Sequence, residues 1–97
     1  MIVVVFKASI AELGAEYRET AARMRALAMA RYGCTGGSST SEDGLEISVS
    51  HWPDMAQVQA WKNDPEHILA QQRGRDRWYQ SYSVQIAELV REYGSAG

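Results

Sequence analysis

Residues 61–71, WKNDPEHILAQ, mark the point where one predicted helix ends and another begins. Asp64 followed by Pro65 is typical of a helix start, because an aspartate side chain caps free backbone N–H groups and proline fits the first helical position. Before that point, three apolar residues fall on one helical stripe: Met55, Val58 and Trp61. The sequence therefore predicts two short helices with a break at residues 63–64.

Outside this stretch, the hydrophobic pattern changes between strand and helix periods. Residues 2–6, IVVVF, form a continuous apolar run that predicts a strand buried on both faces. Residues 11–31 change to steps of three and four, which predicts a helix. Residues 34–44 are poor in apolar groups and predict a weak edge strand that ends in an Asp-Gly turn.

Two further strands complete the pattern. Leu45, Ile47 and Val49 alternate with polar residues, which predicts a strand with one face toward water. Residues 78–92 are rich in aromatic and β-branched side chains and predict a long last strand. The resulting order is β-α-β-β-α-β with a broken second helix, an α+β, ferredoxin-like fold with one antiparallel sheet. We expect residues 1–97 to form a single domain.

The first and last strands lack the polar side chains of a water-exposed face. Helices cover one side of a ferredoxin-like sheet, and the chain has no predicted element left to cover the other. A second copy packed sheet against sheet is the simplest cover, so we expect a homodimer.

Composition excludes several partner classes. The net charge is −2 at pH 7 and the basic residues are dispersed, which argues against nucleic acid. The apolar run after Met1 is too short for a signal peptide or a membrane span. The single cysteine, Cys34, excludes an intrachain disulfide and fits a reducing compartment. We therefore expect a cytoplasmic protein without membrane contact.

The segment from His51 to Arg75, HW followed eight residues later by WKNDPEHILAQQRGR, resembles the antibiotic biosynthesis monooxygenase (ABM) domain family of the dimeric α+β barrel superfamily. The resemblance covers nearly the whole chain. It implies a homodimer whose sheets form a barrel, with a cavity between sheet and helices in each subunit. Some members oxidise aromatic polyketides with O₂ and without metal or flavin, and others degrade haem.

Trp61 and His67 are the first candidates for the site. Trp61 matches a helix tryptophan that lines the cavity in members of this family, although an aromatic residue on a helical stripe is more often simply core. His67 lies in the first turn of its helix, where the positive helix end favours a neutral imidazole that could accept a phenol proton. The alternative for His67 is a purely structural role in the helix cap.

Four more residues complete the candidate site. Tyr79 and Tyr82 belong to the last predicted strand and could hydrogen-bond a phenol or quinone oxygen, or merely pack there. Asn63 could bind substrate or link the helices. Gln71 stands where haem-degrading members carry the iron-binding histidine, and an amide is a poor iron ligand.

The first strand carries another departure from the haem-degrading members. It reads Phe6-Lys7-Ala8 where they carry an asparagine, so we expect no haem. The two histidines and one cysteine show no metal-site spacing either. We therefore expect neither a cofactor nor a metal.

The resemblance implies a cofactor-independent monooxygenase that acts on a small aromatic or quinone-type compound. His67, Tyr79 and Tyr82 are the predicted catalytic residues, and Trp61, Asn63 and Gln71 the predicted substrate-binding ones. Two alternatives stay open: a non-catalytic dimeric module that binds a small molecule or has a filled cavity, and an isomerase or decarboxylase of the same superfamily. The fold by itself does not choose among them.

Overall fold

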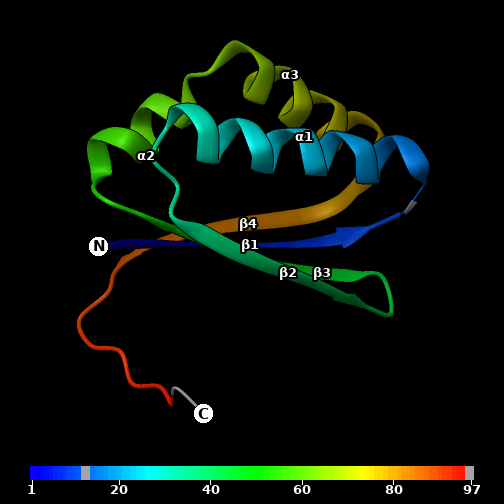
Figure 1. The fold of residues 1–97 in the computed structure, drawn as a ribbon. Coiled ribbons are helices and arrows are strands. Elements are labelled where there is room, and N and C mark those ends of the chain that lie inside the picture. The colour runs from blue at the N-terminus through cyan, green and yellow to red at the C-terminus, as the bar shows by residue number, and fades with distance from the viewer. Residues whose placement is uncertain (12–13, 96–97) are drawn as a thin grey trace.

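The strands form one sheet, and the helices all lie on one side of it (Figure 1). The computed structural model describes residues 1–11 and 14–95. The elements are β1 (Ile2–Ile10), α1 (Ala15–Arg31), β2 (Gly36–Glu42), β3 (Leu45–Trp52), α2 (Met55–Lys62), α3 (Pro65–Arg73), the π-helical turn η1 (Gly74–Trp78) and β4 (Tyr79–Glu88). The strand order is β2-β3-β1-β4 and every neighbouring pair is antiparallel. The predicted α+β, ferredoxin-like fold is confirmed.

The break between the second and third helices occurs where the aspartate–proline pair predicts it. The Asp64 side chain accepts hydrogen bonds from the backbone N–H groups of Glu66 and His67, at 2.8 and 3.1 Å. Asp54 caps α2 in the same way by accepting from the N–H of Gln57 at 2.9 Å. These caps satisfy amides that a helix start leaves without partners. The capping residues therefore determine locally where α2 and α3 begin.

Two boundaries differ from the sequence prediction. β1 runs on to Ile10, because β3 pairs with it up to Ser9 and β4 up to Ile10, and α1 begins only at Ala15. Of the predicted helical residues 11–14, residues 12–13 lie outside the described part of the chain. β4 ends at Glu88 rather than at residue 92, and the segment that follows leaves the body of the molecule below the sheet (Figure 1).

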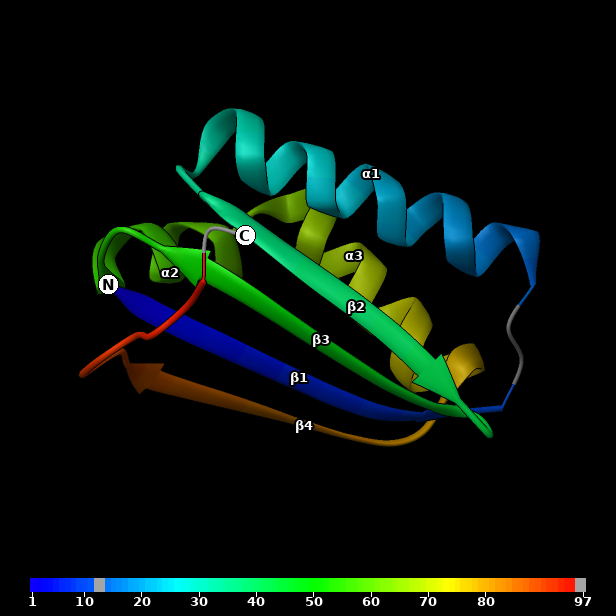
Figure 2. The same cartoon turned by 60° about the horizontal axis from the view of Figure 1, so that its bottom comes forward.

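The helices cover the polar face of β3, and its apolar face points away from them. Glu46 pairs with Ala8, and Trp52 with Ile2, so both side chains lie on the face that the helices cover. Ser48 and Ser50 share that phase, and the apolar side chains of Leu45, Ile47 and Val49 point to the other face. Figure 2 shows that face of the sheet, which no helix covers.

Most of the buried residues form two clusters under the helices, one toward each end of β1. The first contains Ala8, Ile10, Tyr17 and Trp78. The second contains Ala28, Cys34, Trp52 and Val58. Side chains of both clusters line the space between the helices and the sheet, and that space forms the site. In the described residues, no helix is both long and apolar enough to cross a membrane.

Candidate functional site

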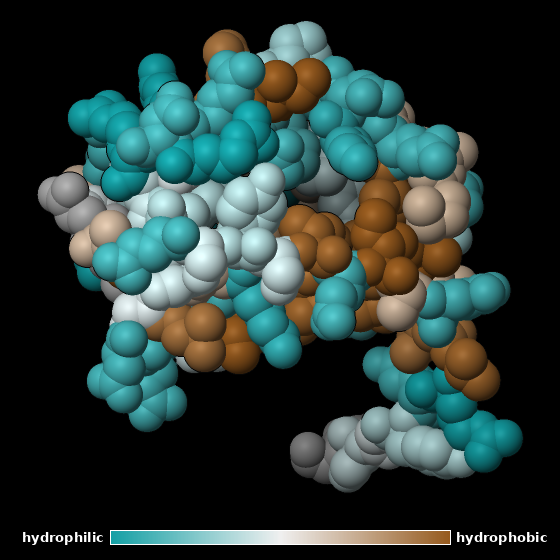
Figure 3. Space-filling model, turned by 180° about the vertical axis from the view of Figure 1, so that it is seen from behind, coloured by the Kyte–Doolittle hydropathy of each residue, from teal (hydrophilic) through white to brown (hydrophobic). Residues whose placement is uncertain are grey.

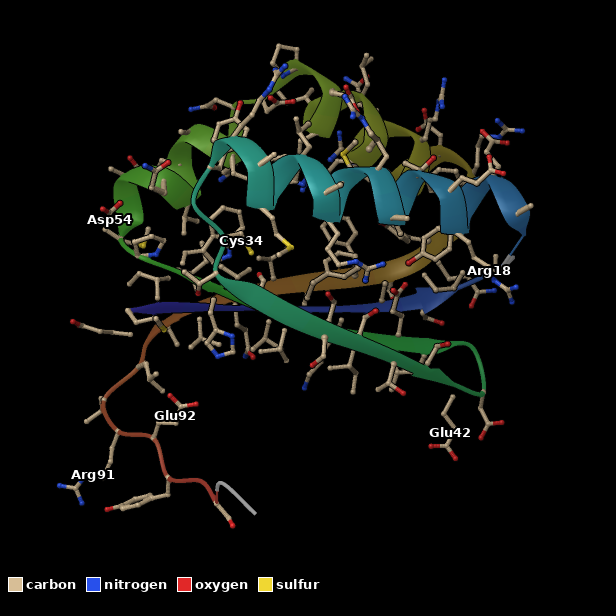
Figure 4. The ribbon with its side chains drawn as sticks, viewed as in Figure 1. Arg18, Cys34, Glu42, Asp54, Arg91 and Glu92 are labelled. Atoms are coloured by element: carbon tan, nitrogen blue, oxygen red, sulfur yellow. The ribbon has the colours of Figure 1, made fainter. Side chains whose placement is uncertain are left out.

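A cavity of about 570 Å³ lies between the sheet and the helices. It falls within the size range of pockets that bind small organic molecules. In Figure 4, Cys34 lies in this space, below α1 and above the sheet. Val84 and Ile86 of β4 line the cavity and are 43% and 45% exposed, so it reaches the surface along this strand. Seen from behind, hydrophobic side chains gather there below the helical layer (Figure 3).

Trp61 and His67 form a stacked pair at one end of the cavity. Their ring centroids are 4.1 Å apart and the planes differ by 13°. Trp61 also contacts Trp52 and Tyr32, at centroid distances of 6.2 and 5.4 Å. The C-terminal end of α2 and the first turn of α3 bring these two side chains together, so the helix break itself builds this end of the cavity.

The hydrogen bond of His67 determines which ring nitrogen is available. Nδ1 lies 3.0 Å from the backbone oxygen of Trp61, and because a carbonyl oxygen can only accept, Nδ1 carries the proton. Burial lowers the pKa of the imidazole below 6.5, which outweighs the opposing influences of the Trp61 carbonyl and Asp64. The neutral ring predominates at pH 7, and its Nε2 keeps a lone pair that no described residue engages. His67 is therefore able to accept a proton from a ligand.

Asp64 supports this end of the cavity from behind. It is buried, and its Oδ2 accepts a hydrogen bond from the Tyr32 hydroxyl at 2.5 Å, while Oδ1 caps α3. The bond from Tyr32 is the main reason that the pKa of Asp64 lies below its ordinary value. An ionised Asp64 holds the first turn of α3, and with it the backbone of His67.

Tyr79, Tyr82 and Phe6 form an aromatic group near the other end of the cavity. The ring of Tyr79 lies 5.4 Å from Phe6 and 5.6 Å from Tyr82. Burial, followed by the charge of Glu46, raises the pKa of Tyr79 to about 12. The hydroxyl therefore remains protonated and can donate a hydrogen bond, but it is a poor base at neutral pH.

The predicted catalytic residues do not form one constellation. Trp52, beside the Trp61–His67 pair, lies opposite Ile2 of β1, and Tyr82 lies opposite Ala8. Ile2 and Ala8 are six residues apart on β1, which corresponds to about 20 Å along the strand. His67 therefore faces one part of the cavity, and the two tyrosines face another.

The structure places most of the predicted binding residues in the cavity wall. Trp61 and Gln71 line it, as do His67, Tyr79 and Tyr82. Asn63 does not: it is the exposed C-terminal cap of α2. Among residues 1–11 and 14–95, no group of three or more histidine, cysteine, aspartate and glutamate side chains has the arrangement of a metal site.

Glu46 is a cavity residue that sequence reasoning missed. Its alternation with Leu45 and Ile47 predicts a position in water, yet it lines the cavity, and its Oε2 is buried without a hydrogen bond from the described residues. Burial raises the pKa of its carboxyl group. The signal that was available is Trp52, a large aromatic residue in the same phase of the strand as Glu46.

Comparison with known proteins gives one close relative in sequence and several in structure. No family model matches the chain. The uncharacterized protein YqjZ of Bacillus subtilis is 39% identical over 90 residues, which span 92% of this chain and 79% of YqjZ. SnoaB, a cofactor-independent oxygenase from Streptomyces nogalater, superposes with a TM-score of 0.82 at 13% identity over 97% of both chains. A candidate antibiotic biosynthesis monooxygenase from Deinococcus radiodurans has a TM-score of 0.71 at 14% identity over the full length of both.

Proposed function

Because the chain belongs to the same family as YqjZ and has the fold of antibiotic biosynthesis monooxygenase domains, we propose that it is a cofactor-independent monooxygenase for a small aromatic compound of the phenol or quinol type. The observation that carries this proposal is a neutral imidazole, stacked on a tryptophan, in the wall of a ligand-sized cavity. An aromatic cavity binds a flat apolar ring, and the imidazole accepts the proton of its hydroxyl group.

The chemistry that such a site supports begins with the substrate. Removal of the phenolic proton by Nε2 of His67 gives an electron-rich anion, which can react with O₂ directly. For an anthrone-type compound, the ring methylene loses two hydrogens and gains one oxygen as a carbonyl, while the second oxygen leaves as water. The substrate supplies all the electrons, so the protein needs only to bind, orient and deprotonate it.

The alternatives from the sequence differ in how they use the cavity. A module with a side-chain-filled interior is not favoured, because the cavity has about 570 Å³ of space. An isomerase or decarboxylase would use the same cavity without consuming O₂. The discriminating measurement is therefore O₂ uptake rather than ligand binding.

The test is O₂ consumption with a panel of anthrone- and quinol-type compounds after metal chelation and without added flavin. We expect turnover by the wild type and a loss of about 100-fold or more in His67→Gln, which keeps hydrogen-bonding capacity but cannot act as the base. Asn63→Ala is the matched control, since Asn63 lies outside the cavity wall. Turnover that requires flavin or iron, or no O₂ uptake with any compound, would refute the proposal.

We also propose that the protein works as a homodimer. The apolar side chains of β1 and β3 that face away from the helices, Val3, Val5, Ile47 and Val49, are only half-buried in the single chain. The segment after β4 also projects apolar groups, with Val90 and Tyr93 exposed by 92% and 81%. In Figure 4, Arg91 on this segment points away from the body of the molecule. A second copy on this face would bury both features.

A further inference from the structure

The cavity has one wall of a different chemistry from the rest. The side of β4 and β1 is apolar and aromatic, with Val4, Phe6, Val84 and Ile86. The side of β2 and β3 carries hydroxyl groups and one carboxyl group, with Ser39, Ser48, Ser50 and Glu46. The register produces this wall, because Ser39 pairs with Ser48 on the two strands of one hairpin.

Glu46 is the one charged group of this polar wall, and it lacks a compensating partner. Arg18 and Arg25 of α1 line a small neighbouring cavity beside it, and Arg25 Nη1 donates to the Ser39 hydroxyl at 3.5 Å. In the described part of the chain, no ion pair joins either arginine to Glu46. A carboxyl group in a cavity wall without a hydrogen bond from the chain costs stability, and it leaves an acceptor that a ligand in the cavity can use.

We propose that Glu46 is a ligand-recognition residue, whose carboxyl group accepts a hydrogen bond from a hydroxyl group of the aromatic ligand at the Tyr79 end of the cavity. The carboxyl lies between the large and the small cavity and contributes to both walls. Oε2 is enclosed by the chain, so Oε1 is the oxygen that the carboxyl group can offer to a ligand. The ligand class is an aromatic ring system with a hydroxyl on the edge that faces the β2–β3 hairpin.

The surroundings of Glu46 favour a hydroxyl rather than a cation as the partner. Two arginines, Arg18 and Arg25, already stand on the side of α1, and their positive charge opposes a cationic ligand. On the side of β4, Tyr79 and Tyr82 line the same end of the cavity and offer their rings to a flat ligand. This inference rests on the proposed function, since both place an aromatic ligand in this cavity, but the hydroxyl group that Glu46 binds is not the one that His67 deprotonates, because the two residues face different parts of the cavity.

The experiment compares naphthol with its methyl ether, two probes that differ in the ability to donate a hydrogen bond. Binding to the full chain is followed through the amide NMR shifts at neutral pH. We expect the wild type to bind naphthol about tenfold more tightly than the ether. Glu46→Leu should abolish the preference, and Glu46→Gln, which retains an acceptor oxygen without the charge, should reduce it to a few-fold.

The control is Glu42→Leu, which removes an exposed carboxylate from the end of β2 that, in Figure 4, points below the sheet and away from the cavity. It should leave the preference at about tenfold. We further expect Glu46→Leu to melt at a higher temperature than the wild type, because it removes a carboxyl group whose Oε2 is buried without a partner.

Three outcomes would overturn the inference. The first is a wild type without the preference for naphthol, and the second is a Glu46→Leu variant that retains this preference. The third is a loss of the preference in both Glu46 variants together with lower melting temperatures, which would mean that Glu46 has a structural role. Failure of the proposed function is distinguishable. If the wild type prefers naphthol through Glu46 but consumes no O₂, only the proposed oxygenase function is refuted. If the wild type consumes O₂ and Glu46→Leu keeps the preference, only the role of Glu46 is refuted.

Discussion

At the scale of single residues, Trp61 has both a packing role and a place in the cavity wall. Its ring contacts Trp52 and Tyr32 on the core side and His67 in the cavity. We expect Trp61→Phe to reduce the free energy of unfolding by about 1–2 kcal/mol through repacking, measured by urea denaturation. If the ring binds the ligand, affinity or turnover should fall by more than this loss explains. An unchanged affinity would restrict Trp61 to the core.

Tyr79 reports on the charge of Glu46. Burial raises the pKa of Tyr79 to about 12, and the Glu46 charge is the second cause. In Glu46→Gln the Tyr79 pKa should fall but stay above 10, because burial remains. The measurement is the alkaline change in phenol absorbance, with Tyr79→Phe to identify the group. An unchanged pKa in Glu46→Gln would mean that the carboxylate does not face this phenol.

The same titration has a consequence for stability. A folded state that holds the Tyr79 proton more tightly than the unfolded chain loses stability as the pH rises from about 10, where an exposed tyrosine ionises, to about 12. Below about pH 10, Tyr79 is protonated in both the folded and the unfolded chain, so its titration does not change the stability with pH. Tyr79→Phe should therefore weaken this part of the alkaline loss of stability, measured as the urea midpoint against pH.

At the scale of elements, the junction of α3 and η1 requires a glycine. A Cβ atom on Gly74 would lie 2.2 Å from Cε2 of Tyr79, so the ring of Tyr79 lies directly against the helix backbone. We expect Gly74→Ala to displace this ring and to destabilise the fold by about 1–3 kcal/mol, measured by urea denaturation. Gly94→Ala is the control, because its added Cβ meets nothing within 4 Å. Equal stability of the two variants would contradict the close contact.

Ion pairs on the outside of the helical layer join α1 to α3 and η1. Arg23 of α1 makes a two-pronged contact with Glu66 of α3, at 2.8 and 3.2 Å. Arg73 and Arg77 both approach Glu16 at the start of α1. These pairs are solvent-exposed, so each contributes little to stability. They lie on the solvent side of the helical layer and do not contribute hydrogen bonds to the cavity wall beneath it.

At the scale of the whole molecule, the uncovered sheet face gives the dimer prediction. Sedimentation equilibrium at micromolar concentration should give about twice the 10.8 kDa of one chain. Val5→Lys places a charge on this face and should shift the protein toward monomer. Leu69→Lys is the control, since Leu69 is 60% exposed on α3, on the helical side of the molecule. A wild-type monomer with a cooperative melt would refute the dimer.

The sequence by itself determined the elements and their order. Local signals carry this information: the aspartate–proline pair at Asp64, the Asp-Gly turn before β3 and the apolar run of β1 act within a few residues. Trp61, His67, Gln71, Tyr79 and Tyr82 were identified from the same local patterns and from the resemblance, and all of them line the cavity.

Only the tertiary structure decided which face of β3 meets the helices and which residues share one end of the cavity. Alternation defines two faces of a strand but does not say which is covered, since that depends on long-range pairing with β1. The pairing of Glu46 with Ala8 places this carboxylate on the cavity side, although its alternation with apolar residues predicts a position in water. The pairings of β1 with β3 and β4 also separate His67 from the tyrosines, because Trp52 beside His67 lies opposite Ile2 and Tyr82 lies opposite Ala8.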